Sequence, residues 1–309
     1  MTQDIISPPC VDNAADSVVI SIPAYNEETT IANIVEQARG YADDVLVVDD
    51  GSTDHTADRA EAAGATVVRH ETNQGYGSAL QTIFTEADRR DVEHLVIIDA
   101  DGQHDPRDIE KLVEAQRTTE AEIVIGSRFA PGAEVDAPLY RRFGLSIINT
   151  LTNLSLRFAY ATPRITDTQS GFRVYNADAI ETMSQKDTLS KGMDISIDIL
   201  FAAAEAGHEF AEIPIDISYD VEDANTHHPI AQGAVLLINT LSRLYHERPA
   251  QLLNFLAVVF IFIGSIPAVA ILSGRTVMQT VPVVIVVLLL AVGAMLSGTA
   301  LILERWVND

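Results

Sequence analysis

Short, continuous apolar runs alternate with helix-type segments along about the first 220 residues of the chain. The apolar runs, each of strand length, lie at 17–22, 45–48, 66–69, 95–98 and 122–125. Further strands are expected after a polar turn at 167–172 and at 210–219. Apolar residues at helical spacing lie between them, at about 30–39, 56–63, 78–89, 106–113, 177–183 and 195–206. Because the strand runs are continuously apolar rather than alternating, they predict a mostly parallel sheet covered by helices on both faces.

Residues 138–160 form a longer amphipathic stretch, in which Arg141 and Arg142 precede a series of apolar side chains. The pattern predicts one or two helices. They either lie on a membrane surface, with the arginines at the lipid headgroups, or pack as ordinary core-facing helices.

The hydropathy changes near residues 230–250. Residues 255–272 are 18 positions without a charge, and residues 281–303 are 23 more. Each run is long enough to cross a hydrocarbon core of about 30 Å, and the short link between them predicts a transmembrane hairpin. Arg243, Arg248 and Arg305 flank the pair on one side, which by the positive-inside rule places the preceding domain in the cytoplasm. A buried hairpin in a soluble fold is the alternative.

These patterns divide the chain into four parts. We expect a flexible tail at 1–16, an α/β domain at 17–229, an amphipathic juxtamembrane segment at 230–250 and the hairpin at 251–309. The tail is polar and has no signal-peptide core. Because of the hairpin, we expect a multi-pass protein of the cell membrane.

The composition is strongly acidic, with a formal net charge of −24 and 44 acidic residues against 20 basic ones. This charge argues against general nucleic-acid binding, which depends on Lys and Arg neutralising phosphates. It is typical of proteins kept soluble in concentrated salt, so we hypothesise a halophilic host, with an acidic mesophilic protein as the alternative. The single Cys10 excludes an internal disulfide.

Polar residues follow several of the predicted strands directly. Asp99 and Asp101 come after the run at 95–98, at the carboxyl edge where open α/β sheets bind ligands. Mg²⁺ or Mn²⁺ is typically held by one or two carboxylates together with substrate phosphates. The pair therefore indicates a site for a metal-bound nucleotide diphosphate, the alternative being an acidic turn after a buried strand.

Other strand ends add candidate ligand contacts at the same edge. Asp49 or Asp50 can accept hydrogen bonds from a base or ribose, and Gly75 lets the backbone approach a ligand closely. Arg128 offers a planar fork for a phosphate or for a departing diphosphate.

The order and spacing of these motifs resemble family 2 glycosyltransferases with a GT-A fold, and more narrowly dolichyl-phosphate mannosyl- or glucosyltransferases. The resemblance covers roughly residues 17–220 and rests on the segments 22–27, 47–54, 73–75, 99–106, 126–129 and 170–173. It implies a Rossmann-like, mostly parallel sheet with helices on both faces. It also implies inverting transfer of a hexose from a UDP- or GDP-sugar to dolichyl or polyprenyl phosphate, at an early step of lipid-linked glycan assembly for protein N-glycosylation.

The resemblance also implies roles for particular residues. Asp99, Asp101 and Gln103 would hold Mg²⁺ or Mn²⁺, and Asp101 and Arg128 would be the catalytic residues. The donor would contact Pro23, Tyr25, Asn26, Glu27, Asp49, Asp50, Gly75 and Asp99. The acceptor or its phosphate would contact Ser170 and Arg173, with Asn225, His227 or His228 substituting for a phosphate-binding element that the loop 221–229 lacks. In the glycine turn that begins at residue 73, Tyr76 precedes the second glycine, at a position where the family commonly has Lys or another residue.

The acceptor can be a lipid phosphate or a sugar hydroxyl, and the sequence leaves both open. A phosphate monoester has a second pKa of about 6 and needs no strong general base. Relatives that glycosylate sugar hydroxyls generally carry a carboxylate base and a Gln-x-x-Arg-Trp motif, which this sequence lacks. Transfer to a sugar hydroxyl is the alternative, and a non-enzymatic membrane scaffold is the remaining hypothesis.

Overall fold

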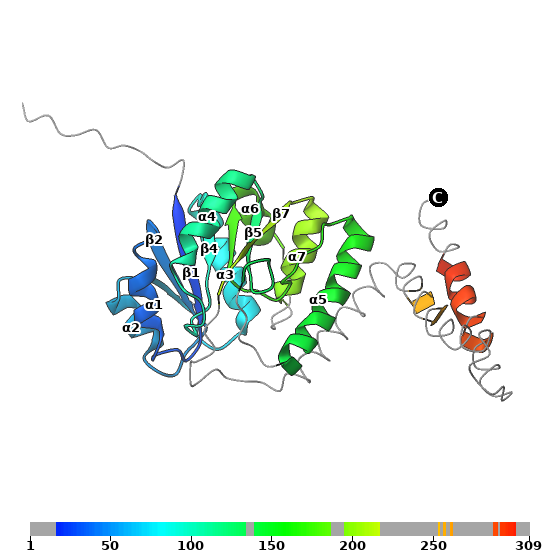
Figure 1. Cartoon of the computed structure of the whole chain (residues 1–309). Coiled ribbons are helices and arrows are strands. Elements are labelled where there is room, and N and C mark those ends of the chain that lie inside the picture. Colours follow the sequence, from blue (N-terminus) through cyan, green and yellow to red (C-terminus); the bar gives the residue numbers. More distant parts are fainter. Residues whose placement is uncertain are drawn as a thin grey trace, which may run out of the picture. The chain divides into compact units, whose positions relative to one another are not determined.

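The computed structural model describes residues 17–133, 139–186, 195–216, 253, 256–257, 260–261, 287–289 and 291–300 (Figure 1). The chain divides into two compact units, one built from residues Met1–Leu156 and Thr162–Pro229 and the other from Arg157–Ala161 and Ile230–Asp309. The tail at 1–16, the loop at 217–229 and the juxtamembrane segment at 230–250 lie outside the described residues.

Seven strands of the described chain form one sheet in the order β3-β2-β1-β4-β6-β5-β7. Neighbours run parallel except where β6 pairs antiparallel with β4 on one side and β5 on the other. The strands are β1 (Val18–Ala24), β2 (Asp44–Asp49), β3 (Thr66–Arg69), β4 (His94–Ile97), β5 (Ile123–Ser127), β6 (Arg173–Asn176) and β7 (Phe210–Pro214). The predicted mostly parallel α/β sheet is therefore confirmed.

Helices flank the sheet on both faces (Figure 1). They are α1 (Ile31–Ala38), α2 (Thr56–Ala62), α3 (Tyr76–Arg89), α4 (Asp108–Thr119), α5 (Leu139–Tyr160), α6 (Ala177–Ser184) and α7 (Ile195–Ala206). The stretch expected as one or two helices at 138–160 is the single helix α5. The expected strand at 210–219 is described only as far as Pro214.

Alternate residues of the central strands are buried on opposite faces. Ile20 and Ile22 of β1 belong to a core cluster that includes α1 and α4. On β6, Tyr175 meets Phe84 of α3 edge to face, with ring centroids 5.0 Å apart. Burial on both faces explains why the strand runs are continuously apolar.

The predicted hairpin falls mostly outside the described residues. Among those that are described, no helix is both long and apolar enough to cross a bilayer. Within the second unit, two helical pieces pack closely at Gly293. A Cβ there would lie 2.7 Å from Cγ1 of Ile261 and 3.0 Å from the carbonyl oxygen of Ala257.

Candidate active site

The sheet topology brings five chain segments to one edge. β1, β2, β4 and β5 all end there, and antiparallel β6 begins there, so residues 167–172 arrive at the same edge. A cavity of about 410 Å³ opens at this edge. It is lined by Pro23, Ala24, Tyr25, Glu27, Asp50, Asn73, Tyr76, Ala79, Asp99, Ala100, Asp101, Gln169, Gly171 and Ser196.

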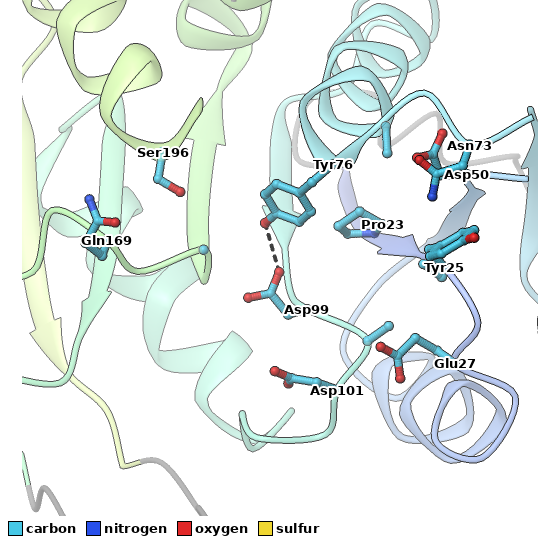
Figure 2. Close-up of a pocket in the computed structure, with 14 residues that line it drawn as sticks. Pro23, Tyr25, Glu27, Asp50, Asn73, Tyr76, Asp99, Asp101, Gln169 and Ser196 are labelled. Carbon is cyan, nitrogen blue, oxygen red and sulfur yellow. Dashed lines mark hydrogen bonds between the residues drawn. The ribbon is translucent and has the colours of Figure 1, made fainter. Parts of the chain in front are cut away.

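The lining residues divide the cavity into two halves (Figure 2). Pro23, Tyr25, Asp50 and Asn73 lie on one side, and Gln169 and Ser196 lie on the other. The carboxylates of Asp99 and Asp101 lie between them.

The turn after β1 is held by the turn after β2. Asn26 adopts a left-handed φ of 56°, which asparagine tolerates, and its Oδ1 accepts a hydrogen bond from the Thr53 amide at 2.9 Å. The amide of Glu27 donates to Oγ1 of Thr56 at 2.8 Å. These bonds fix Tyr25, whose residue surface is 44% exposed, at the mouth of the cavity.

Asp50 organises the glycine turn that precedes α3. Its carboxylate accepts the amides of Gln74 at 3.0 Å and Gly75 at 2.8 Å, and it lies 2.6 Å from Nδ1 of His70. Gly75 has a φ of 98°, a conformation that favours glycine. Asp50 therefore lines the cavity and fixes the turn that carries Asn73.

Asp49 takes a different position from Asp50. Its side chain is completely buried, pairs with Nε of Arg69 at 3.1 Å and accepts the Ser52 amide at 3.1 Å. It does not line the cavity. Of the two carboxylates that were alternatives for contacting a nucleoside, the structure brings only Asp50 to the pocket.

Asp99 and Asp101 form a pair of partly buried carboxylates that face the cavity. Burial raises the pKa of both, and the negative charge of Asp99 raises that of Asp101 further. Gln103 donates its backbone amide to Oδ1 of Asp101 at 3.0 Å, although its side chain does not line the cavity. In the described parts of the chain, no three His, Cys, Asp or Glu side chains converge on one metal position. Two mutually repelling carboxylates facing a cavity fit Mg²⁺ or Mn²⁺, since these cations take their remaining ligands from water and phosphates.

Glu27 adds a third acidic group near this pair. The pKa of Glu27 is raised to about 7, mainly by burial of its carboxyl group. A hydrogen bond from Thr30 lowers it, and the charges of Asp101, Asp54 and Asp99 raise it. Near neutral pH, this carboxyl group is therefore poised between its two protonation states.

The two candidate phosphate-binding arginines lie behind the cavity wall. Arg128 forms a bidentate ion pair with buried Asp167, with Nε–Oδ2 and Nη2–Oδ1 distances of 2.6 and 2.8 Å. Arg173 is almost completely buried and donates to the carbonyl oxygens of Ser196 and Thr168, both at 3.2 Å. Neither lines the cavity, but both charges lower the pKa of Asp99.

Of the residues proposed to bind the acceptor or its phosphate, the structure also describes Ser170. Ser170 is buried next to the cavity, and its hydroxyl group lies 3.5 Å from the carbonyl oxygen of Phe172. Asn225, His227 and His228 lie outside the described residues.

Sequence reasoning missed Gln169 and Ser196 as lining residues. The signal for Gln169 was the polar turn at 167–172, whose direction depends on the antiparallel pairing of β6. Ser196 lies in the first turn of α7 and has no local sequence signal.

Residues 19–183 match the sequence model of glycosyl transferase family 2, and the chain belongs to this family of enzymes. It is 34% identical over 206 residues to the undecaprenyl-phosphate mannosyltransferase of Micrococcus luteus, covering 64% of this chain and 82% of that protein. It is 28% identical over 244 residues to the UDP-N-acetylglucosamine–dolichyl-phosphate N-acetylglucosaminyltransferase of Methanococcus voltae, covering 72% of this chain and 92% of that protein.

The solved structure of glucosyl-3-phosphoglycerate synthase from Mycobacterium tuberculosis, in complex with Mn²⁺, UDP and phosphoglyceric acid, has a similar fold. The TM-score is 0.54 at 20% sequence identity, and the match covers 75% of this chain and 78% of that one. The α/β fold is therefore GT-A-like.

Proposed function

We propose that this glycosyltransferase transfers a hexose, with inversion, from a UDP- or GDP-sugar to dolichyl or polyprenyl phosphate. The observation that carries the proposal is the placement of Asp99 and Asp101 between two polar halves of one cavity. A nucleotide-sugar has the same layout, with a diphosphate between a nucleoside and a sugar. The names of the relatives from Micrococcus luteus and Methanococcus voltae support a polyprenyl phosphate as the acceptor.

The residues on the nucleoside side suit a base and a ribose. Tyr25 offers an exposed ring for stacking, and Pro23, Asn26 and Glu27 form the turn beside it. Asp50 and Gly75 hold Asn73 at the cavity, where its amide group can bind a nucleoside.

The residues at the centre suit the diphosphate. Asp99 and Asp101, with Gln103 beside them, would hold Mg²⁺ or Mn²⁺, which supplies positive charge to a departing diphosphate. Arg128 adds a fixed positive charge near Asp99, because Asp167 locks the plane of its guanidinium group. Ser170 and Arg173 would act beside the acceptor phosphate, Arg173 through its charge rather than by direct contact.

An acceptor phosphate is already largely ionised at neutral pH and attacks the anomeric carbon without a strong base. Transfer to a sugar hydroxyl, the second candidate, would require a general base beside the hexose. Glu27 has a pKa of about 7, which suits a general base, but it lies on the nucleoside side of the cavity, away from Gln169 and Ser196 (Figure 2).

The membrane location belongs to the proposal as well. The uncharged runs at 255–272 and 281–303 would form a hairpin that holds the enzyme beside its lipid substrate, with the catalytic domain on the cytoplasmic side. Large apolar side chains are exposed in the second unit, namely Ile261, Val287, Leu288, Val292 and Met295. This pattern suits a lipid environment. The reaction would be an early step of lipid-linked glycan assembly.

A transfer assay tests the proposal. The full-length protein in membranes is given dolichyl phosphate, Mg²⁺ or Mn²⁺, and a panel of labelled UDP- and GDP-hexoses. Label that reaches the lipid phase and is released by mild acid identifies a glycosyl phosphate and names the donor. Acid-stable lipid label would favour the hydroxyl acceptor. Asp101→Ala is the inactive control, and near-normal transfer by this variant would contradict the metal assignment.

A further inference from the structure

The half of the cavity opposite Asp50 and Asn73 contains a polar group that no part of the proposed mechanism uses. Nε2 of Gln169 is buried and has no hydrogen-bond partner among the residues that the structure describes. Figure 2 shows Gln169 and Ser196 together on this side of Asp99. Buried polar groups are nearly always hydrogen-bonded in folded proteins, so each exception requires an explanation.

The backbone beneath Gln169 is fixed from several directions. Asn149 of α5 accepts hydrogen bonds from the amide and the hydroxyl group of Thr168, at 3.1 and 2.6 Å. Arg173 donates to the carbonyl oxygen of Thr168. The backbone amide of Gln169 donates to Oδ1 of Asp167 at 3.3 Å. The loop therefore fixes the backbone from which the Gln169 side chain reaches the cavity wall before any ligand binds.

The chemistry of this half suits a neutral ligand. Gln169 and Ser196 carry an amide and a hydroxyl group, and the nearby guanidinium group of Arg173 donates to backbone carbonyl oxygens. A phosphate in direct contact with Gln169 and Ser196 would call for a cation facing the cavity at that position. A sugar hydroxyl both donates and accepts, so it matches a carboxamide whichever way its oxygen and nitrogen are assigned.

We propose that Gln169 hydrogen-bonds one hydroxyl group of the hexose being transferred and so contributes to the choice of donor sugar. This inference rests on the proposed function, because it places the diphosphate at Asp99 and Asp101 and the nucleoside beside Asp50. The hexose then reaches the side of Gln169 and Ser196.

The test combines a variant with altered donors in one thermodynamic cycle. The full-length wild-type protein and Gln169→Met, which keeps the length of the side chain, are compared on the active nucleotide-sugar and on analogues that lack one ring hydroxyl each. We expect one analogue to lower kcat/KM of the wild type about 10-fold, the size of one hydrogen bond, and to have no further effect on Gln169→Met. The Kd of the nucleoside diphosphate alone should change less than twofold.

A buried glutamine outside the cavity provides the matched control. Gln116 bonds His94 and the carbonyl oxygen of Glu122, so Gln116→Met should lower stability and keep the wild-type response to every analogue. The inference is overturned if Gln169→Met responds to all analogues as the wild type does, or if it weakens the nucleoside diphosphate and the nucleotide-sugar equally. Failure of the wild type to bind any nucleotide-sugar would instead overturn the proposed function, and this inference with it.

Discussion

The hydroxyl group of Tyr76 donates a hydrogen bond to Oδ1 of Asp99 over 2.8 Å. Gly171 closes the other side of the same carboxylate, since a Cβ at this position would lie 2.7 Å from Oδ2. Asp99 is thus held between a hydroxyl group from the start of α3 and a backbone segment that leads into β6. Both neighbours should affect how well the site binds a divalent cation.

Removing the hydroxyl group of Tyr76 should weaken cation binding. Tyr76→Phe keeps the ring but leaves Oδ1 of Asp99 without its donor, so we expect the Kd for Mn²⁺ to rise roughly 5- to 30-fold. Electron paramagnetic resonance of free Mn²⁺ measures this without turnover. Tyr41→Phe, a change at a partly buried ring next to the core, is the control. Unchanged Mn²⁺ binding in Tyr76→Phe would show that the hydrogen bond does not orient Asp99.

Adding a methyl group at Gly171 should displace the same carboxylate. The φ of Gly171 lies outside the left-handed region, so Gly171→Ala introduces a steric effect without backbone strain. We expect Mn²⁺ binding to weaken about 10-fold or more, with Tm changed by only a few degrees. Gly40→Ala, where the new Cβ lies 3.4 Å from its nearest neighbour, should leave Mn²⁺ binding intact.

The raised pKa of Glu27 predicts a pH-dependent stability. Between the ordinary value of 4.5 and about 7, the folded state binds more protons than the unfolded state, so stability falls as pH rises through this window. Glu27→Gln should remove this loss. With allowance for solvent screening of a half-exposed group, the variant should be about 1 kcal/mol more stable than the wild type at pH 8. Urea unfolding at pH 5 and pH 8 in EDTA measures the difference, and parallel stability profiles for the two proteins would refute the assignment.

The Arg128–Asp167 pair should behave as a buried ion pair. Burial raises the pKa of Asp167, but the hydrogen bonds and charge of Arg128 outweigh it and hold the pKa below its usual range. Asp167→Asn leaves Arg128 without its charged partner and should cost about 3–5 kcal/mol in unfolding free energy. Replacing both residues, as Arg128→Met with Asp167→Leu, should recover much of that stability but no transfer activity. Transfer by the double variant would contradict a catalytic role for Arg128.

Removing the predicted hairpin should separate catalysis from membrane attachment. Without residues 251–309 we expect the protein to leave the membrane fraction, and kcat/KM for a long polyprenyl phosphate to fall at least about 10-fold because the lipid substrate is no longer concentrated beside it. The Kd for the nucleotide donor should be unchanged. Equal use of membrane-bound acceptor by the shortened protein would contradict the anchoring role.

Much of the fold could be predicted because burial on both faces makes each parallel strand continuously apolar. Since parallel strands end at a common edge, the amino-acid sequence alone also predicts that Asp99 and Asp101 lie close to the turn that carries Asp49 and Asp50. The roles of Asp49 and Asp50 could not be separated, since adjacent residues at a strand end point to opposite sides and the sequence does not show which side is open. Gln169 and Ser196 reach the cavity through the antiparallel pairing of β6 and the packing of α7. Both depend on contacts between distant segments that local patterns do not encode.

The position of β6 also constrains the order in which a growing chain can fold. β6 lies between β4 and β5 in the sheet, yet it is made after both. The block β3-β2-β1-β4 is complete once residue 97 has left the ribosome, whereas β5 has no partner in the sheet until β6 emerges about 50 residues behind it. During this interval β4 presents an unpaired edge. A slow stretch of translation, or a chaperone that shields residues 94–97, would therefore affect the yield of this protein more than the yield of a protein whose strands pair in chain order.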